Sequence, residues 1–338
     1  MGLCAKRQAA CPPGRAGRLV LCSTGSVEDI TMLTRNAKGV FVIAPTPFMP
    51  DGALDLASAD RMTDAFLAAG AGGLTLLGVM GEAPKLDQEE ALAFTKRVIN
   101  RVAGRVPVVV GASAPGFASM RAIARGSMDL GAAGIMVAPA SGLKGDDAVS
   151  AYIAQAMDAV GDAPFVLQDF PQLTGIQISA AMVARAAADS RLVMLKAEDC
   201  PGLDKLSAIR RMEAEGKMPR ISILGGNGGQ FLPEELARGA DGIMTGYAFP
   251  EMLTEVIALM AAGKRDAAQD AFDLHLPLIR SELQPGLGLA IRKHVLARRG
   301  IIAHAALRAP GPKLSAETTA EIDHLLARLQ ARGGAKLP

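Results

Sequence analysis

Short, wholly apolar runs alternate with longer segments of helical character from Gly39 onward. Because these runs are apolar throughout rather than at every second position, they predict strands of a parallel sheet covered on both faces. We expect eight strands, at residues 40–44, 73–77, 106–111, 135–138, 165–168, 193–196, 221–224 and 242–245. Helices are expected between them, at residues 56–69, 88–102, 117–130, 146–160, 179–189, 203–215 and 231–238.

A short motif that recurs at three strand starts supports this pattern. Residues 70–74, 131–135 and 239–243 each begin with a glycine placed to end a helix, and each leads through a tight turn into an apolar run. Eight such units in succession predict a (β/α)8 TIM barrel, whose active site lies at the C-terminal ends of the strands. A doubly wound α/β sheet is the alternative, but no GxGxxG motif follows the first strand.

The two ends of the chain differ from this regular middle part. Residues 1–36 are rich in Arg, Gly, Ser and Cys without periodicity, and we interpret them as a disordered extension. The barrel is expected at 37–263 and a C-terminal helical region at 264–338. This region should hold three helices, at about 264–283, 286–299 and 315–332. Four charged residues of its second helix are expected on a solvated face or at a subunit contact: Arg292, Lys293, Arg298 and Arg299.

Composition excludes several classes of function. The net charge is +2 and no basic run is interleaved with aromatic residues, which disfavours nucleic-acid binding. No apolar stretch reaches the roughly 18 residues that a membrane span needs. The four cysteines form no CxxC pair, which is typical of a reducing, cytoplasmic compartment. The four histidines all fall in the C-terminal fifth at spacings that suggest no metal site, so we expect neither a metal nor an organic cofactor.

The strongest candidate for chemistry is Lys196, which ends the apolar run 192–195. A buried ammonium costs several kcal/mol unless it loses its proton or gains a partner. A lysine that loses its proton readily is the nucleophile that Schiff-base chemistry with a ketone requires. Glu198 points to the same side of the extended chain, because residues i and i+2 share a face. The alternatives are a lysine that reaches solvent and a glutamate that only pairs with it.

Several strand ends together resemble the dihydrodipicolinate synthase / N-acetylneuraminate lyase family of class I aldolases, over about residues 39–335. Ala44-Pro45-Thr46-Pro47-Phe48 resembles the first-strand segment of that family, and Lys196 matches its Schiff-base lysine. Gly78-Val79-Met80-Gly81-Glu82 resembles the GxxGE loop that holds the keto-acid carboxylate. The resemblance implies a lyase for a small 2-keto acid, assembled as a homotetramer.

Four positions depart from the usual pattern of that family. Gln168 stands where its catalytic tyrosine is expected, 28 positions before the lysine, and Leu173 replaces the arginine that dihydrodipicolinate synthase uses for its second substrate. Val79 and Met80 replace two hydroxyl residues, which leaves only backbone N–H donors. Gln168-Asp169 with Lys196-x-Glu198 instead resembles the 2-keto-3-deoxy-L-arabonate dehydratase branch, as do the Met-Thr-Gly segment at 244–246 and the Phe-Pro pair that follows it.

We therefore expect dehydration of such a 2-keto-3-deoxy sugar acid, giving 2-oxoglutarate semialdehyde from the arabonate. Lys196 would form the imine, Glu198 would act as acid and base, and Gln168 would orient the hydroxyl or a water. Retro-aldol release of pyruvate is one alternative, and a non-catalytic keto-acid-binding regulator is another. Residues expected to contact substrate are Gly78, Val79, Met80, Gly81, Glu82, Gly225, Met244 and Tyr247, although Tyr247 would equally suit core packing.

Overall fold

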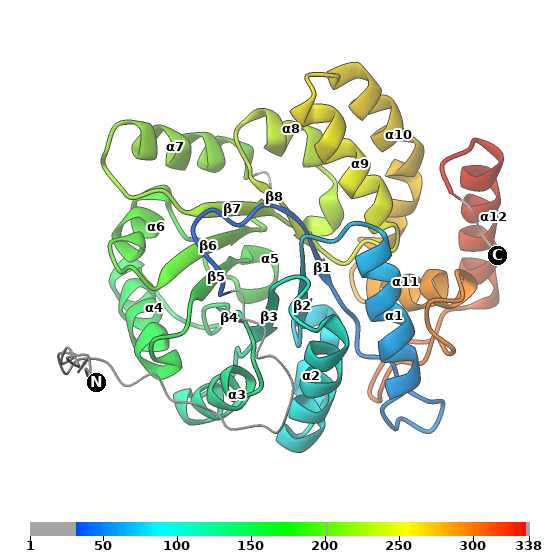
Figure 1. Cartoon of the computed structure of the whole chain (residues 1–338), viewed down its shortest axis with the longest axis horizontal. Coiled ribbons are helices and arrows are strands. Elements are labelled where there is room, and N and C mark those ends of the chain that lie inside the picture. The colour runs from blue at the N-terminus through cyan, green and yellow to red at the C-terminus, as the bar shows by residue number, and fades with distance from the viewer. Residues whose placement is uncertain (1–31, 201, 336–338) are drawn as a thin grey trace, which may run out of the picture.

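Eight parallel strands form a closed barrel at the centre of the computed structural model, which describes residues 32–200 and 202–335 (Figure 1). They are β1 (Gly39–Ile43), β2 (Gly73–Leu76), β3 (Val108–Gly111), β4 (Gly134–Val137), β5 (Phe165–Asp169), β6 (Leu192–Ala197), β7 (Ser222–Gly225) and β8 (Gly242–Thr245). Each strand pairs in parallel with the next along the chain, and β8 pairs with β1. The predicted (β/α)8 barrel is confirmed.

Helices surround the barrel and alternate with its strands (Figure 1). They are α1 (Leu56–Ala68), α2 (Gln88–Val102), α3 (Phe117–Asp129), α4 (Asp146–Val160), α6 (Ala180–Ala187), α7 (Leu203–Ala214), α8 (Leu232–Ala237) and α9 (Pro250–Ala261). The predicted set lacked α9, although Pro250 at its first position is a common start signal. The third strand begins two residues later than predicted, after Pro107, because proline cannot donate a ladder hydrogen bond.

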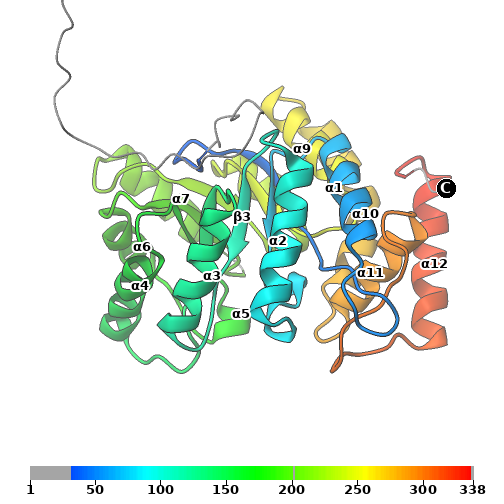
Figure 2. The same cartoon turned by 60° about the horizontal axis from the view of Figure 1, so that its bottom comes forward.

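Three further helices lie together on one side of the barrel, near α1 and α9 (Figures 1 and 2). They are α10 (Arg265–Glu282), α11 (Gly288–Arg298) and α12 (Ala316–Ala331). Among the residues that the structure describes, no helix is long and apolar enough to cross a bilayer.

The apolar residues form two cores. The larger core lies between the strands and the surrounding helices. The smaller core fills the barrel with side chains that include Phe41, Ile43, Val109, Met136, Val166, Met194, Leu224 and Met244. This packed plug closes the lower part of the barrel, so that a ligand reaches the strands only from their ends.

The predicted N-terminal extension is too long at its C-terminal end. Residues 1–31 lie outside the described part of the chain, but Leu33 is buried and its N–H donates to the Ala133 carbonyl at 2.9 Å. The Arg35 guanidinium donates to three backbone carbonyls between α6 and β6. Leu33 and Arg35 therefore pack against the end of the barrel at which the strands begin. The sequence did not indicate this, because their neighbours in the chain are mostly polar.

The solvated face predicted for Arg292 and Lys293 is wrong, because both side chains are buried on α11. The Lys293 ammonium donates to Glu82 Oε1 at 2.6 Å and to the Ala306 carbonyl at 2.8 Å. Burial lowers the pKa of Lys293, while Glu82 opposes that shift. This ion pair fixes the C-terminal helical region to the loop after β2.

Candidate active site

The three predicted catalytic side chains meet at the C-terminal ends of β5 and β6. The register of these strands places Gln168 directly beside Lys196. Lys196 Nζ lies 2.7 Å from Glu198 Oε2, and Gln168 Nε2 donates to the same oxygen at 2.6 Å. All three residues are less than 7% exposed. A primary amine thus contacts a carboxylate whose orientation an amide holds, inside a site that excludes most water.

The loop after β7 supports the carboxylate from the other side. The Asn227 backbone N–H faces Glu198 Oε1 at 3.4 Å, and Asn227 Nδ2 donates to the Glu198 carbonyl at 2.8 Å. A Cβ on Gly226 would collide with the Glu198 side chain, which explains the glycine. The sequence prediction missed Asn227, although it is the one polar residue in the run Gly225-Gly226-Asn227-Gly228-Gly229.

A cavity of about 320 Å³ opens above this cluster. Lys196, Glu198 and Gln168 line it together with Asn227, Thr245 and residues of the C-terminal helical region: Glu282, Gln284, Leu289 and Arg292. A second lobe of about 360 Å³ shares Val79, Gln168 and Leu289 with the first and is lined mainly by apolar side chains. The C-terminal helical region, in which the sequence analysis named no site residue, therefore forms one wall of the cavity.

Only some residues of the loop at 78–82 line this cavity. Val79 and Met80 line the first lobe, and Gly78 lines the second. Gly81 is held from behind, since Thr46 Oγ1 donates to its carbonyl at 2.6 Å. The Glu82 carboxylate accepts from Lys293 and from Lys85 Nζ at 2.8 Å, although the residue also borders the second lobe. Glu82 thus anchors the loop through these ion pairs.

Besides Gly81, three residues expected to contact substrate line neither lobe. Met244 belongs to the core inside the barrel, below the cavity. The Tyr247 hydroxyl lies 2.8 Å from His275 Nδ1 in a fully buried site, which matches the alternative of core packing. Gly225 faces outward, where a Cβ would collide with the Glu235 carboxylate of α8. Its small size therefore accommodates a protein side chain rather than substrate.

Two carboxylates adjacent to the site face away from the cavity. Lys205 Nζ lies 2.7 Å from Asp169 Oδ2 and 2.7 Å from Asp199 Oδ2. Burial raises the pKa of Asp169 to about 6, while Lys205 opposes that shift. This outer ion-pair cluster holds the ends of β5 and β6 together without lining the cavity.

We expect Glu235→Gln to stabilise the fold at neutral pH. Burial, with Glu234 and Glu198 nearby, raises the pKa of Glu235 from 4.5 to about 8. The folded state thus takes up a proton between these pKa values, and its stability falls as pH rises from about 4.5 to 8. Glutamine mimics the protonated form, so the gain should be near zero at pH 4.5 and on the order of 3 kcal/mol at pH 7.

Urea unfolding of both proteins at several pH values measures this gain. Glu255→Gln, at an exposed position of α9, is the control and should not reproduce the pH-dependent difference. A Glu235→Gln difference that is constant between pH 4.5 and 8 would contradict the assignment of a raised pKa to Glu235.

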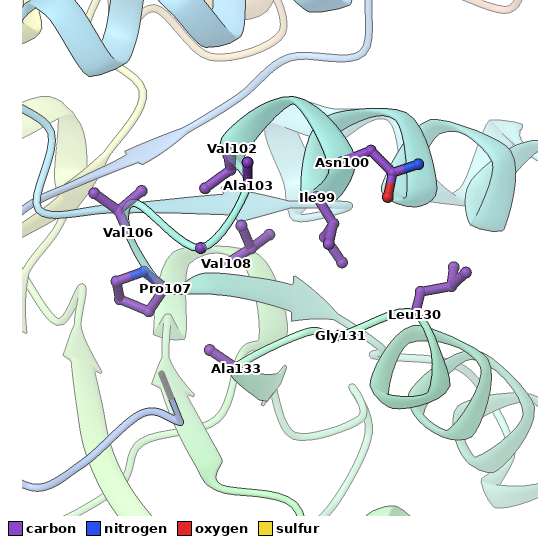
Figure 3. A pocket seen from close by; sticks show the side chains of 11 residues that line it. Ile99, Asn100, Val102, Ala103, Val106, Pro107, Val108, Leu130, Gly131 and Ala133 are labelled. Carbon is purple, nitrogen blue, oxygen red and sulfur yellow. The ribbon is translucent and has the colours of Figure 1, made fainter. Parts of the chain in front are cut away.

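A cavity of about 340 Å³ lies at the opposite end of the barrel, between α2 and α3 (Figure 3). Val108 at the start of β3 and Ala133 just before β4 line it. The other lining residues are Ile99, Asn100, Val102, Ala103, Gly104, Val106, Pro107, Leu130 and Gly131. None of these described residues is ionisable, so their side chains offer no acid or base to a ligand in this cavity.

Known proteins resemble this chain over nearly its whole described length. L-2-keto-3-deoxyarabonate dehydratase of Azospirillum brasilense is 30% identical, over 88% of this chain and 96% of that protein. 4-Hydroxy-tetrahydrodipicolinate synthase 1 of Streptomyces coelicolor is 32% identical, over 86% and 93%. A crystal structure of dihydrodipicolinate synthase from Rhodopseudomonas palustris is 49% identical, with a TM-score of 0.86 over 88% of this chain and 99% of that one. Residues 36–329 match the dihydrodipicolinate synthetase family, and the chain therefore belongs to this family of (β/α)8-barrel enzymes.

Proposed function

We propose that the protein is a Schiff-base lyase that dehydrates a 2-keto-3-deoxy sugar acid of the 2-keto-3-deoxy-L-arabonate type. The observation that carries this proposal is the 2.7 Å contact between Lys196 Nζ and the Glu198 carboxylate, both of which line the cavity. The relative from A. brasilense, which is named as such a dehydratase, supports the choice of substrate.

Lys196 suits the role of nucleophile better than the other buried lysine near the site. Its amine lines the cavity, and its contacts are with the carboxylate that would take part in proton transfer. Lys293 is fully buried between Glu82 and the Ala306 carbonyl and lines neither lobe. A ketone bound in the cavity therefore meets the amine of Lys196.

The reaction follows from these groups. The Lys196 amine adds to the C2 ketone, and loss of one water gives a protonated imine that acidifies the C3 hydrogens. The Glu198 carboxylate takes one C3 proton and forms an enamine. The enamine expels the C4 hydroxyl, which leaves as water with the proton that Glu198 held. Tautomerisation at C5 and addition of one water to the imine release 2-oxoglutarate semialdehyde, so that one water is lost overall.

The residues around the second lobe disfavour the 4-hydroxy-tetrahydrodipicolinate synthase reaction, after which other relatives such as the S. coelicolor protein are named. Leu173, which replaces the arginine for a second carboxylate, is half-exposed and apolar. Lys85 borders the same lobe but is paired with Glu82. Gln168 cannot transfer a proton as tyrosine does, although its contact with Glu198 keeps that carboxylate in place. A second substrate with a carboxylate would thus find no free cation here.

Retro-aldol cleavage is the alternative within the same chemistry, because it also begins with an imine at Lys196. It breaks the C3–C4 bond and needs a base at the C4 hydroxyl rather than at C3. The placement of Glu198 beside the amine favours removal of a C3 proton and hence dehydration. The homotetramer and the cytoplasmic location remain predictions.

Incubation with 2-keto-3-deoxy-L-arabonate, followed by mass analysis of the products, tests the proposal. We expect a product that is lighter by one water and no pyruvate. Release of pyruvate would move the enzyme to the aldolase alternative. Absence of turnover, together with saturable binding of 2-keto acids, would favour the non-catalytic regulator.

A further inference from the structure

A buried ion pair from the C-terminal helical region faces the same cavity as Lys196. Glu282 ends α10, Arg292 lies in α11, and both side chains are at most 4% exposed. Arg292 Nε donates to Glu282 Oε2 at 2.8 Å. Within the described part of the chain, the guanidinium makes this one hydrogen bond. Its two terminal nitrogens therefore remain available to a ligand in the cavity.

The guanidinium lies at the mouth of the barrel, between the ends of β8 and β1. A Cβ on Gly246 would come within 3.0 Å of Arg292 Nη1 and within 2.9 Å of the Ile43 carbonyl. Gly246 thus leaves the space that this side chain occupies. Lys196 stands on β6, two strands away around the barrel, and lines the same cavity. A ligand joined to Lys196 at one end can therefore extend toward Arg292 with its other end.

The side of the cavity that the C-terminal helical region forms is suited to bind hydroxyl groups. Glu282 already supplies the counter-charge of Arg292, so a second carboxylate would gain little net attraction there. Burial raises the pKa of Glu282, although Arg292 opposes that shift. The guanidinium still presents N–H donors in a fixed plane, and Thr245 and Gln284 add polar side chains nearby. The second lobe, by contrast, is lined mainly by apolar side chains.

We propose that Arg292, held in place by Glu282, binds the hydroxyl-bearing end of the substrate and thereby selects 2-keto acids with a hydroxylated tail. This inference rests on the proposed function, because it takes Lys196 as the point where the keto end is bound. It assigns a specificity role to a helical region outside the barrel.

The Arg292→Gln variant distinguishes binding of the hydroxylated end of the substrate from binding of its keto end. We expect kcat/KM for 2-keto-3-deoxy-L-arabonate to fall about 10- to 150-fold, mainly through KM, because hydrogen bonds from a charged donor are lost. Pyruvate has no tail, so the concentration that half-saturates its borohydride trapping should stay within about twofold of wild type. Arg298→Gln is the matched control, since Arg298 lies on the same helix with its side chain 59% exposed. It should leave both values unchanged.

Arg292→Lys serves if the glutamine variant unfolds, because lysine keeps the charge beside Glu282 but loses the planar pair of donors. This variant should also have a lower kcat/KM for the hydroxylated acid, while its trapping by pyruvate and borohydride should persist. A parallel rise of the pyruvate half-saturation would show that Arg292 binds the keto-acid carboxylate and would overturn the inference. Unchanged kcat/KM, or a wild-type preference for a 2-keto-3-deoxy dicarboxylate, would overturn it as well. Failure of wild type to be trapped by pyruvate would overturn the proposed function itself, and the inference with it.

Discussion

Replacing Lys196 by arginine is expected to abolish both turnover and covalent trapping of 2-keto acids. Arginine retains the positive charge beside Glu198 but stays protonated and cannot form an imine. We expect kcat to fall by at least roughly 10³-fold, because removal of a nucleophile leaves only binding and positioning. Steady-state kinetics and intact mass after borohydride treatment measure the two effects.

The choice of arginine matters for the interpretation. Methionine would leave the Glu198 carboxylate buried without its cation, which destabilises a protein strongly. The thermal midpoint of Lys196→Arg should therefore lie near that of wild type, and loss of activity can be assigned to chemistry. An arginine variant that keeps measurable turnover and an adduct of normal yield would place the nucleophile elsewhere.

Replacing Glu198 by glutamine is expected to separate imine formation from the later steps. Without a carboxylate next to Lys196, no group at this position can take the C3 proton. We expect kcat to fall about 10²- to 10⁴-fold, the usual contribution of a positioned acid–base group. Borohydride trapping of pyruvate should persist, because it requires only the amine and the ketone.

Asp199→Asn is the matched control for this experiment. Asp199 adjoins Glu198 in sequence but pairs with Lys205 outside the cavity. Its replacement should leave kcat within a few-fold of wild type. A Glu198→Gln variant that can no longer be trapped would show that Glu198 serves mainly to position Lys196, and one with normal kcat would remove it from the mechanism.

Much of the barrel could be predicted because its strands are apolar along their whole length. A run such as 192–195 admits few other interpretations in a chain with helical segments on both sides. The missed features depend on contacts that are distant in sequence. Leu33 is buried against Ala133, and α9 was passed over although Pro250 marks its start.

The site could be predicted in part for the same reason. Lys196, Glu198 and Gln168 lie at strand ends, where period-two geometry and strand register bring them together. Arg292 could not be placed, because α11 is buried on most of its surface and adjacent charged residues gave no clear polar face. One signal was present in the sequence: apolar residues flank Arg292 and Lys293 on both sides, at 290–291 and 295–296, which is not typical of a solvated helix face.

Gly225 shows a further limit of reasoning from sequence. A glycine-rich strand end suggests close approach of a ligand, and the sequence does not say which partner comes close. In the structure Glu235 occupies the space beside Gly225, and Glu198 occupies the space beside Gly226. Both glycines accommodate carboxylates of the protein itself.

The most direct test of the account is to locate the covalent adduct in the wild-type enzyme. The protein is incubated with pyruvate, reduced with borohydride, digested and sequenced by mass spectrometry. We predict one modified residue, Lys196, with a mass increase that corresponds to a reduced pyruvate imine. An adduct confined to another lysine, or no adduct at saturating pyruvate, would contradict the central claim.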